Sequence, residues 1–166
     1  MKDKNYWVEK LSLEPHPEGG FYREVYRSDE IISETALPDR FSGDRVFSTS
    51  IYFLLNKNDV SAFHRIKQDE IWHFYDGSSL TIHIITPEGA YSSVKLGLNI
   101  DEDEFPQIVV KAGCYFAAEV NNKEHYTLTG CTVAPGFDFA DFDMPSFEQL
   151  IVLFPQYKGV FEKLII

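Results

Sequence analysis

The sequence predicts an all-β fold, a jelly roll or a barrel, with a short helix near its beginning and one or two short helices at its end. Eight or nine short runs combine aromatic or β-branched residues with polar ones, and clusters of Gly, Pro, Asn and Asp separate them. Their regular spacing favours a jelly roll or barrel over β-α-β units. Hydrophobic residues make up 44% and aromatic residues 15% of the chain, which is enough to build a core.

Residues 4–12 are expected to form a short amphipathic helix, because apolar residues such as Trp7 and Leu11 are compatible with helical spacing. The helix should end before Pro15, which cannot continue it. The segment 21–27 follows two glycines and mixes aromatic and β-branched residues with charged ones, a pattern typical of a half-buried strand.

The other strands are expected between turn residues, as at 56–59 and 76–78. They span 46–55, 60–66, 70–75, 79–86, 91–96, 107–110, 114–119 and 125–133. Near the end of the sequence Ser146 is a candidate helix cap and Pro155 interrupts the apolar pattern, so we expect two short helices there.

A length of 166 residues fits one domain with a single hydrophobic core. We therefore expect one domain over 1–166, with the barrel at about 18–142 and the closing helices at about 146–165.

Fifteen Lys and Arg against 26 Asp and Glu give a formal net charge of −11, which nucleic acid or an anionic membrane would repel. The longest apolar runs, such as 51–55 and 150–154, are far shorter than the roughly 20 residues that span a bilayer. The first residues lack the apolar core of a signal peptide. We expect a cytoplasmic protein that binds neither nucleic acid nor membrane.

One histidine and one glutamate have a recognisable spacing. His64 is followed by five residues and Glu70, then by six residues and Gly77. This spacing resembles the first conserved motif of the cupin superfamily. Ile66 stands where that motif has its second histidine, and Phe116 stands where the second cupin motif ends on a histidine. The resemblance implies a double-stranded β-helix, the cupin jelly roll, in which two antiparallel sheets enclose a pocket.

Longer phrases resemble one family of small cupins, DUF985 or cupin type 5. They include Pro-His-Pro-Glu-Gly-Gly-Phe-Tyr-Arg at 15–23, Ser-Ile-Tyr-Phe-Leu-Leu at 50–55, Asp-Glu-Ile-Trp-His-Phe-Tyr-Asp-Gly at 69–77 and Gly-Cys-Thr-Val-Ala-Pro-Gly-Phe-Asp-Phe at 130–139. The resemblance covers most of the chain from about 13 to 142. The family pattern Val-Pro-Ala-Gly-x-Trp-Phe is Val-Lys-Ala-Gly-Cys-Tyr-Phe at 110–116, which places Lys111 at one rim of the expected site.

His64 and Glu70 are the candidate catalytic residues. His64 faces the barrel interior if it follows its motif position, and Glu70 is expected near it on the next strand. The same alternation gives the pocket mainly apolar walls, for which we expect ligand contacts from Ile66, Trp72, Phe74 and Phe116.

Two arginines on the segment 21–27 are further candidates. Arg23 and Arg27 could point the same way and hold a carboxylate or a phosphate, the alternative being surface ion pairs. Among the basic residues we expect Arg23 and Lys111 to contact the ligand.

A buried carboxyl beside an imidazole can exchange protons near neutral pH, because burial raises the carboxyl pKa and an adjacent imidazolium lowers it. His64 could then abstract a proton next to a carbonyl while Glu70 orients it, as in an epimerase or isomerase acting on a sugar-like or carbonyl substrate. The alternative is a non-catalytic binding protein, in which the pair only satisfies its own hydrogen bonds.

No metal cofactor is expected. A metal-dependent cupin needs about three or four converging ligands, and the motif positions supply only His64 and Glu70. A metal-dependent oxygenase or isomerase that uses these two residues stays an alternative. Its third ligand could be His73, if the strand bulged to turn that side chain inward.

The expected partners are a small molecule and a second copy of the chain. No phosphate-binding glycine loop, Gly-x-Ser-x-Gly elbow or Cys-x-x-Cys pair occurs, which argues against nucleotide-dependent transferases and serine hydrolases. Cupin barrels often pair through an edge strand, and the aromatic excess could supply an apolar contact. The resemblance therefore predicts a homodimer.

Overall fold

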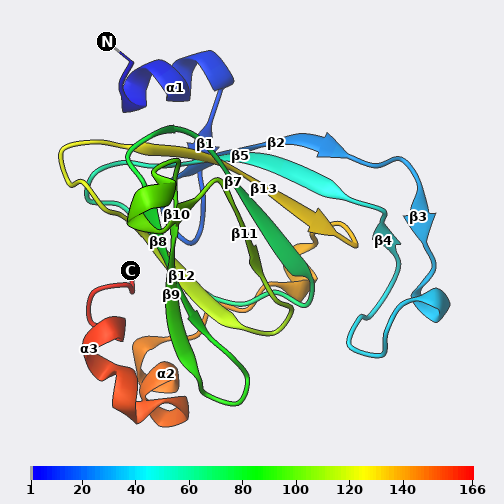
Figure 1. The fold of residues 1–166 in the computed structure, drawn as a ribbon. Coiled ribbons are helices and arrows are strands. Elements are labelled where there is room, and N and C mark those ends of the chain that lie inside the picture. The colour runs from blue at the N-terminus through cyan, green and yellow to red at the C-terminus, as the bar shows by residue number, and fades with distance from the viewer. Residues whose placement is uncertain (1) are drawn as a thin grey trace.

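The computed structural model describes residues 2–166 and contains two β-sheets that pack against each other (Figure 1). The larger sheet has six strands, in the order β1 (Glu14–Pro15), β2 (Phe21–Arg27), β5 (Thr49–Leu55), β13 (Thr127–Ala134), β7 (Asp69–Gly77) and β11 (Gln107–Val110). The smaller sheet has five, in the order β10 (Glu104–Phe105), β9 (Tyr91–Leu96), β8 (Leu80–Ile85), β12 (Tyr115–Val120) and β6 (Val60–His64). Neighbouring strands are antiparallel except β10 and β9, so the predicted all-β fold is confirmed.

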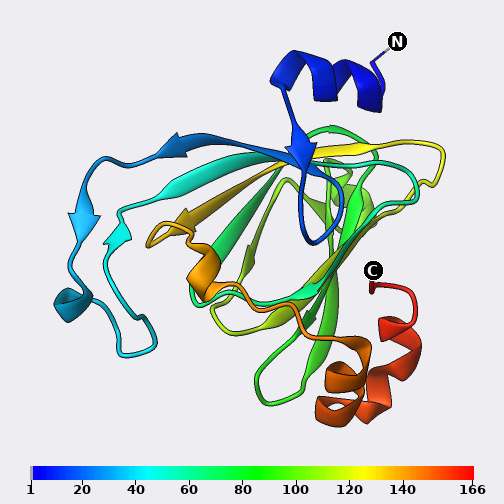
Figure 2. The ribbon, with the colours of Figure 1, turned by 180° about the vertical axis from the view of Figure 1, so that it is seen from behind.

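The segment 46–55 differs from its prediction as one continuous strand. It divides into β4 (Arg45–Val46) and β5, and the backbone N–H of Ser28 donates to the Ser48 carbonyl between them at 3.0 Å. β4 pairs with β3 (Ile31–Ile32) in a two-stranded arm that also carries the short helix η1 (Glu34–Ala36). This arm extends away from the barrel (Figure 2).

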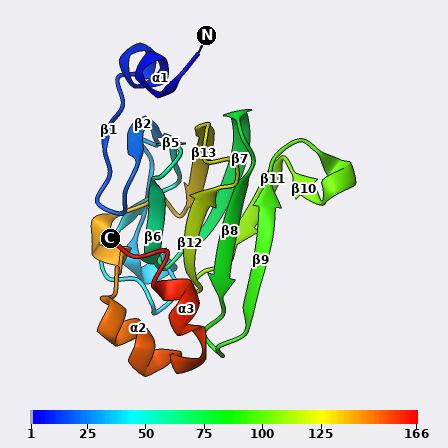
Figure 3. The same cartoon turned by 90° about the vertical axis from the view of Figure 1, so that its left-hand side faces the viewer.

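Short helices precede and follow the strands, as predicted, and they lie at opposite sides of the barrel (Figure 3). Helix α1 (Lys4–Leu11) begins after Asp3, whose side chain accepts the Tyr6 backbone N–H. A capping box between Ser146 and Gln149 begins α2 (Phe147–Leu153). The short helices η4 (Pro155–Tyr157) and α3 (Lys158–Phe161) follow. The last helix therefore ends at Phe161, before the predicted end at about residue 165. None of the helices among residues 2–166 is long and apolar enough to cross a membrane.

The main core lies between the two sheets. Trp72 is fully buried there, and its ring meets Phe53 and Phe116 edge to face, with centroids 5.7 and 6.4 Å apart. Burial of each such side chain contributes about 1.5–3 kcal/mol. A second cluster, which includes Phe63 and Phe161, packs the C-terminal helices against the outside of the smaller sheet.

A buried ion pair holds the loop 135–142 against β4 of the arm. Nε and Nη2 of Arg45 donate to the two carboxylate oxygens of Asp141 at 2.7 and 2.6 Å, and both residues are buried. The side-chain amide of Gln68 donates to the same carboxylate at 2.7 Å. Asp141 ends the short helix η3 (Phe139–Asp141), so the pair fixes the part of the loop that carries aromatic side chains.

Replacing Asp141 with Ala should lower the free energy of unfolding by about 3–5 kcal/mol, because it leaves the Arg45 charge buried without its partner. Urea unfolding measures the change. The matched control is Asp143→Ala, whose ion pair with Arg65 is about half exposed and should contribute about 1 kcal/mol or less. Equal losses in the two variants would contradict the anchoring role of Asp141.

Candidate functional site

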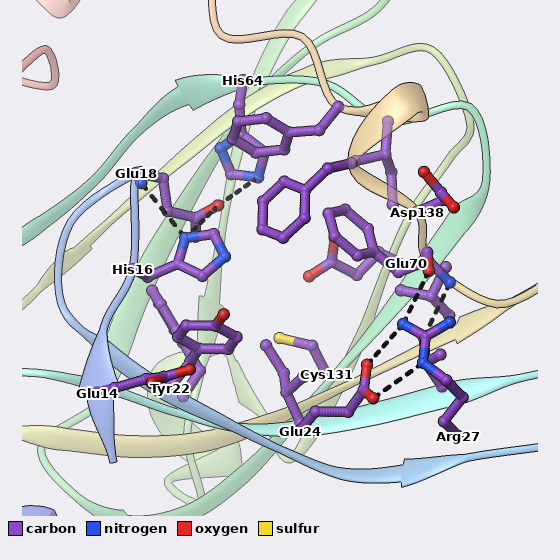
Figure 4. A pocket seen from close by; sticks show the side chains of 18 residues that line it. Glu14, His16, Glu18, Tyr22, Glu24, Arg27, His64, Glu70, Cys131 and Asp138 are labelled. Atoms are coloured by element: carbon purple, nitrogen blue, oxygen red, sulfur yellow. Dashed lines mark hydrogen bonds and ion pairs between the residues drawn. The ribbon is translucent and has the colours of Figure 1, made fainter.

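A cavity of about 440 Å³ lies between the larger sheet and the loop 135–142 (Figure 4). This volume falls within the range of about 300–1,000 Å³ that is usual for small-molecule pockets. The lining side chains come from the turn before β2, from the larger sheet, from β6 and the residues after it, and from the loop. They are Glu14, His16, Glu18, Tyr22, Glu24, Arg27, Thr49, Ile51, Phe53, His64, Ile66, Glu70, Cys131, Val133, Phe137, Asp138, Phe139 and Phe142.

The turn between β1 and β2 brings His16 and Glu18 into the cavity. Gly19 has a φ of 107°, which glycine adopts without steric strain. The Glu18 carbonyl accepts the backbone N–H of Ala62 at 2.8 Å, which fixes the turn against β6. A Cβ on Gly19 would collide with the Val60 carbonyl, so the close approach of the turn to β6 requires a glycine at that position.

His64 and Glu18 form a pair that holds one proton. Nδ1 of His64 lies 2.7 Å from the Ala62 carbonyl, which can only accept, so this nitrogen carries a hydrogen. Nε2 lies 3.2 Å from Oε2 of Glu18, and this contact requires a proton between the two atoms. Burial raises the pKa of Glu18 and lowers the pKa of His64, so burial disfavours the charged form of both groups. Ser61 donates to the other Glu18 oxygen at 2.8 Å.

His16 presents an N–H to the cavity. Its Nδ1 accepts the backbone N–H of Glu18 at 3.3 Å, so the neutral ring carries its hydrogen on Nε2. The other ring nitrogen points toward the middle of the cavity (Figure 4). The His16 side chain is only 7% exposed, and burial lowers its pKa against the opposing effect of the Glu18 charge. The ring is therefore neutral at neutral pH and can donate to an acceptor on a ligand.

Glu70 faces the same cavity from β7 and is 7% exposed. The thiol of Cys131 lies beside its carboxyl, and no Lys, Arg or His forms an ion pair with that carboxyl within residues 2–166. Burial raises the pKa of Glu70 from 4.5 to about 7, opposed by His64 and reinforced by Glu18. Near neutral pH the group is thus divided between its acid and its carboxylate form. Glu70 can accept a proton from a ligand and return it.

Three predicted site residues, His64, Ile66 and Glu70, line the cavity. The predicted wall residues Trp72, Phe74 and Phe116 do not, and this expectation is corrected. Their side chains lie in or against the packed core between the sheets, although Phe116 also contacts His64 with ring centroids 4.1 Å apart. Strand alternation identifies interior side chains, but it does not distinguish those that fill the core from those that face open space.

Arg23 also lies outside the cavity. Its guanidinium donates to the Leu11 carbonyl at 3.0 Å. A bulge in β2 after Glu24 adds one residue and reverses the alternation, so that Arg27 lies on the cavity side and Arg23 does not. Arg27 is itself engaged by Glu24 through two hydrogen bonds of 2.9 and 2.8 Å. The predicted clamp for a carboxylate or phosphate is therefore not formed.

Lys111 is the last predicted contact that lies elsewhere. Its ammonium donates to Asp69 at 2.8 Å, and the lysine side chain is 73% exposed. It follows β11, the edge strand farthest from β2 in the larger sheet, and it does not line the cavity.

The expected role of His64 also changes. Both of its ring nitrogens are occupied, one by the Ala62 carbonyl and one by Glu18, so it has no free nitrogen with which to abstract a proton from a ligand. The groups with free capacity toward the cavity are the Glu70 carboxyl and Nε2 of His16. Glu70 is therefore the better candidate for the base.

Sequence reasoning missed His16 and Glu18, although a signal for them exists. The phrase Pro-His-Pro-Glu-Gly-Gly at 15–20 places two ionisable residues between residues that restrict or permit special backbone angles. Such a combination indicates a rigid turn that holds side chains in a fixed position. The rings of the loop, Phe137, Phe139 and Phe142, alternate with two Asp residues, a spacing that favours a packed edge flap over a ligand contact. Their place in the cavity wall depends on contacts between distant parts of the chain, which that spacing does not contain.

The donor set of the cavity differs from what a metal ion needs. Within residues 2–166, no three His, Cys, Asp or Glu side chains are arranged as ligands of one ion. Ile66 and Phe116, at the motif positions of two histidines, carry no donor atom. His73 faces away from the cavity and lies 3.1 Å from the Thr132 hydroxyl. These residues fit a hydrogen-bonded proton site better than a metal centre.

Comparison with known proteins gives a consistent family and fold. The family model described as Cupin superfamily (DUF985) matches residues 5–145. A yeast relative, Uncharacterized protein YML079W of Saccharomyces cerevisiae, is 30% identical over 143 residues, which are 81% of this chain and 71% of that protein. The crystal structure of protein SO0799 from Shewanella oneidensis is 42% identical with a TM-score of 0.91, and the match covers 100% of this chain and 99% of the other.

Two further structures extend the comparison. A hypothetical protein from Leishmania major is 32% identical with a TM-score of 0.89, over 99% of both chains. The oxalate decarboxylase of Lactobacillus farciminis is 12% identical with a TM-score of 0.55, over 92% of this chain and 41% of that one. The decarboxylase shares the fold alone. These structural similarities agree with the predicted cupin jelly roll.

Proposed function

The chain belongs to the Cupin superfamily (DUF985) family, and from that premise we propose that it binds a small carbonyl or sugar-like molecule in this cavity and moves a proton on it, as an epimerase or isomerase does. One observation carries the proposal. A carboxyl that is nine-tenths buried, with a pKa of about 7, faces a cavity of a size that fits a small molecule. Such a group has the pKa that general acid-base catalysis at neutral pH requires.

The proposed reaction uses two ligand-facing groups. The Glu70 carboxylate takes the proton from the carbon next to the substrate carbonyl, and the electron pair of that C–H bond moves toward the carbonyl oxygen. Nε2–H of His16 donates to this oxygen and stabilises its developing charge. If the enolate turns its other face to Glu70, return of the proton to the same carbon gives the epimer. If the proton returns to the former carbonyl carbon while the neighbouring hydroxyl passes its own proton to the former carbonyl oxygen, the product is the isomer. The contact between Glu18 and His64 holds the turn that positions His16.

Solvent exchange tests this proposal on a panel of compounds rather than on one chosen substrate. The protein is incubated in D₂O with a series of aldoses, ketoses and amino sugars, and ¹H NMR follows the proton next to each carbonyl. We expect the protein to accelerate the loss of this signal for at least one compound. If a compound binds to the protein and its proton next to the carbonyl does not exchange, the protein is a binding protein without turnover.

Elemental analysis tests the metal-dependent alternative. We expect the purified protein to hold no stoichiometric transition metal, because the donor set within residues 2–166 does not converge on one point. One equivalent of metal that leaves on chelation, with loss of exchange activity, would replace proton transfer by Glu70 with metal-assisted chemistry.

A homodimer completes the proposal. Exposed apolar side chains on β2 and the arm, Val25, Tyr26, Ile31 and Phe47, could pack against a second copy. β1 covers β2 only at Phe21 and Tyr22, which leaves the rest of that strand edge open to pairing. Sedimentation should give twice the monomer mass of 19.1 kDa at micromolar concentration. A 19.1 kDa species alone would contradict the dimer.

A further inference from the structure

The charges that line the cavity are strongly unequal. Five carboxyl groups face it, from Glu14, Glu18, Glu24, Glu70 and Asp138, against one guanidinium, that of Arg27. Arg27 directs Nε and Nη2 to Glu24 and shares Nη2 with the Phe137 carbonyl at 3.3 Å, so its charge is already balanced. Glu14 and Asp138 have no ion-pair partner among residues 2–166. Negative charge therefore remains at the mouth of the cavity.

Aromatic rings surround the same space. Tyr22 and Phe53 come from the sheet, and Phe137, Phe139 and Phe142 from the loop. The His16 ring lies between these two groups, 4.5 Å from the Tyr22 centroid and 6.3 Å from that of Phe139. The faces of aromatic rings carry negative partial charge and attract cations. Rings and carboxylates together favour a positively charged guest.

Two buried polar groups in the cavity have hydrogen-bonding capacity that a guest would use. Glu70 is 7% exposed, lines the cavity and has no ion-pair partner within residues 2–166; the nearby Cys131 thiol is only a weak donor. His16 is 7% exposed at its side chain, and its Nε2 points into the cavity. Buried polar groups are normally hydrogen-bonded, so both groups have bonding capacity that a ligand would use.

We propose that the guest of this cavity carries a protonated amine, attracted by the carboxylates of Glu14 and Asp138 on opposite sides of the cavity and held among the surrounding rings, and that the cavity discriminates against carboxylates and phosphates. The guest's remaining polar atoms reach Glu70 and His16. The inference rests on the proposed function only in that it assigns the guest to the same cavity. An amino sugar or an amino-carbonyl compound has the required groups.

The thiol of Cys131 allows a direct test, because it lines the cavity. Three methanethiosulfonates of similar size modify thiols and differ in charge: the methyl reagent is neutral, the 2-aminoethyl reagent is cationic and the 2-sulfonatoethyl reagent is anionic. Rates of modification are measured on the native protein, and peptide mass spectrometry assigns the modified residue to Cys131 rather than to the other free cysteine, Cys114. Dividing by the rates for 2-mercaptoethanol removes the intrinsic differences between the reagents.

The cationic reagent should modify Cys131 about tenfold or more faster than the anionic one after this correction. The double variant Glu14→Gln/Asp138→Asn should reduce the ratio several-fold. The matched control Asp101→Asn/Glu102→Gln removes the same charge from exposed residues outside the cavity and should leave it unchanged.

Equal rates, or a faster anionic reagent, would overturn the amine proposal and leave proton transfer at Glu70 intact. A ratio that falls equally in the control variant would also overturn it, because the selection would then come from the net charge of the whole protein. Burial raises the pKa of the Cys131 thiol, so the rates are measured at the highest pH at which the protein stays folded. If even the neutral reagent reaches Cys131 there only after unfolding, the cavity is closed to guests, and the amine proposal and the proposed function fail together.

Discussion

In a Glu70→Gln variant, the proton exchange catalysed by the protein is expected to fall by a factor of about 10²–10⁴, the usual contribution of a general base. Gln has nearly the same shape and cannot accept the proton. In the wild-type protein the rate should rise with pH through about 7, because only the carboxylate form of Glu70 acts as a base and burial raises the Glu70 pKa to that value. NMR in D₂O at a series of pH values gives both results.

A matched control separates this role from a general effect of lost charge. Glu119 is a partly buried glutamate on β12 that pairs with His83 and Lys123 outside the cavity. Glu119→Gln should leave the exchange rate and its pH profile unchanged. Retention of more than about a tenth of the wild-type rate in Glu70→Gln, against the range expected for a general base, would remove Glu70 from the reaction.

The same Glu70→Gln variant should be more stable than the wild-type protein above neutral pH, by up to about 3 kcal/mol. The native Glu70 pKa of about 7 exceeds the ordinary 4.5 of the unfolded chain, so the native state retains its proton while the unfolded state loses it. Each pH unit between the two values lowers wild-type stability by about 1.4 kcal/mol. Below pH 4.5 both states are protonated and the variants should agree; above about 7 the difference is complete.

Urea unfolding of both proteins at pH 4 and pH 8 measures this effect as a difference, so other titrating groups cancel. A carboxyl kept only to satisfy a buried hydrogen bond would give the opposite result, because its replacement would cost stability at both pH values. If Glu70 is kept for catalysis, its replacement should raise the stability of the protein and lower its activity.

The strands could be predicted because their signals are local. β9 (Tyr91–Leu96) and β11 (Gln107–Val110) agree with the expected ranges residue for residue, since turn residues bound both of them closely. The sequence predicts one strand over 46–55 because no Gly, Pro, Asn or Asp interrupts that run. Its division at Ser48 depends on a hydrogen bond from Ser28, which lies in a different part of the chain.

The site could be predicted only in part, for related reasons. His64, Ile66 and Glu70 follow from motif spacing and strand alternation, and they line the cavity. Alternation also predicts that Arg23 and Arg27 point the same way, but one bulged residue between them in β2 puts them on opposite sides. Glu18 reaches His64 because its turn is fixed against β6, a contact that no local pattern contains.

The most direct test of the central claim is the pKa of Glu70 itself. In protein labelled with ¹³C at the glutamate side-chain carboxyl, the Glu70 signal is assigned by its loss in Glu70→Gln and followed by NMR from pH 4 to 9. A midpoint near 7 is predicted, since burial raises the Glu70 pKa to about that value. A midpoint near the ordinary 4.5 would contradict the claim that this cavity holds a proton-transferring group.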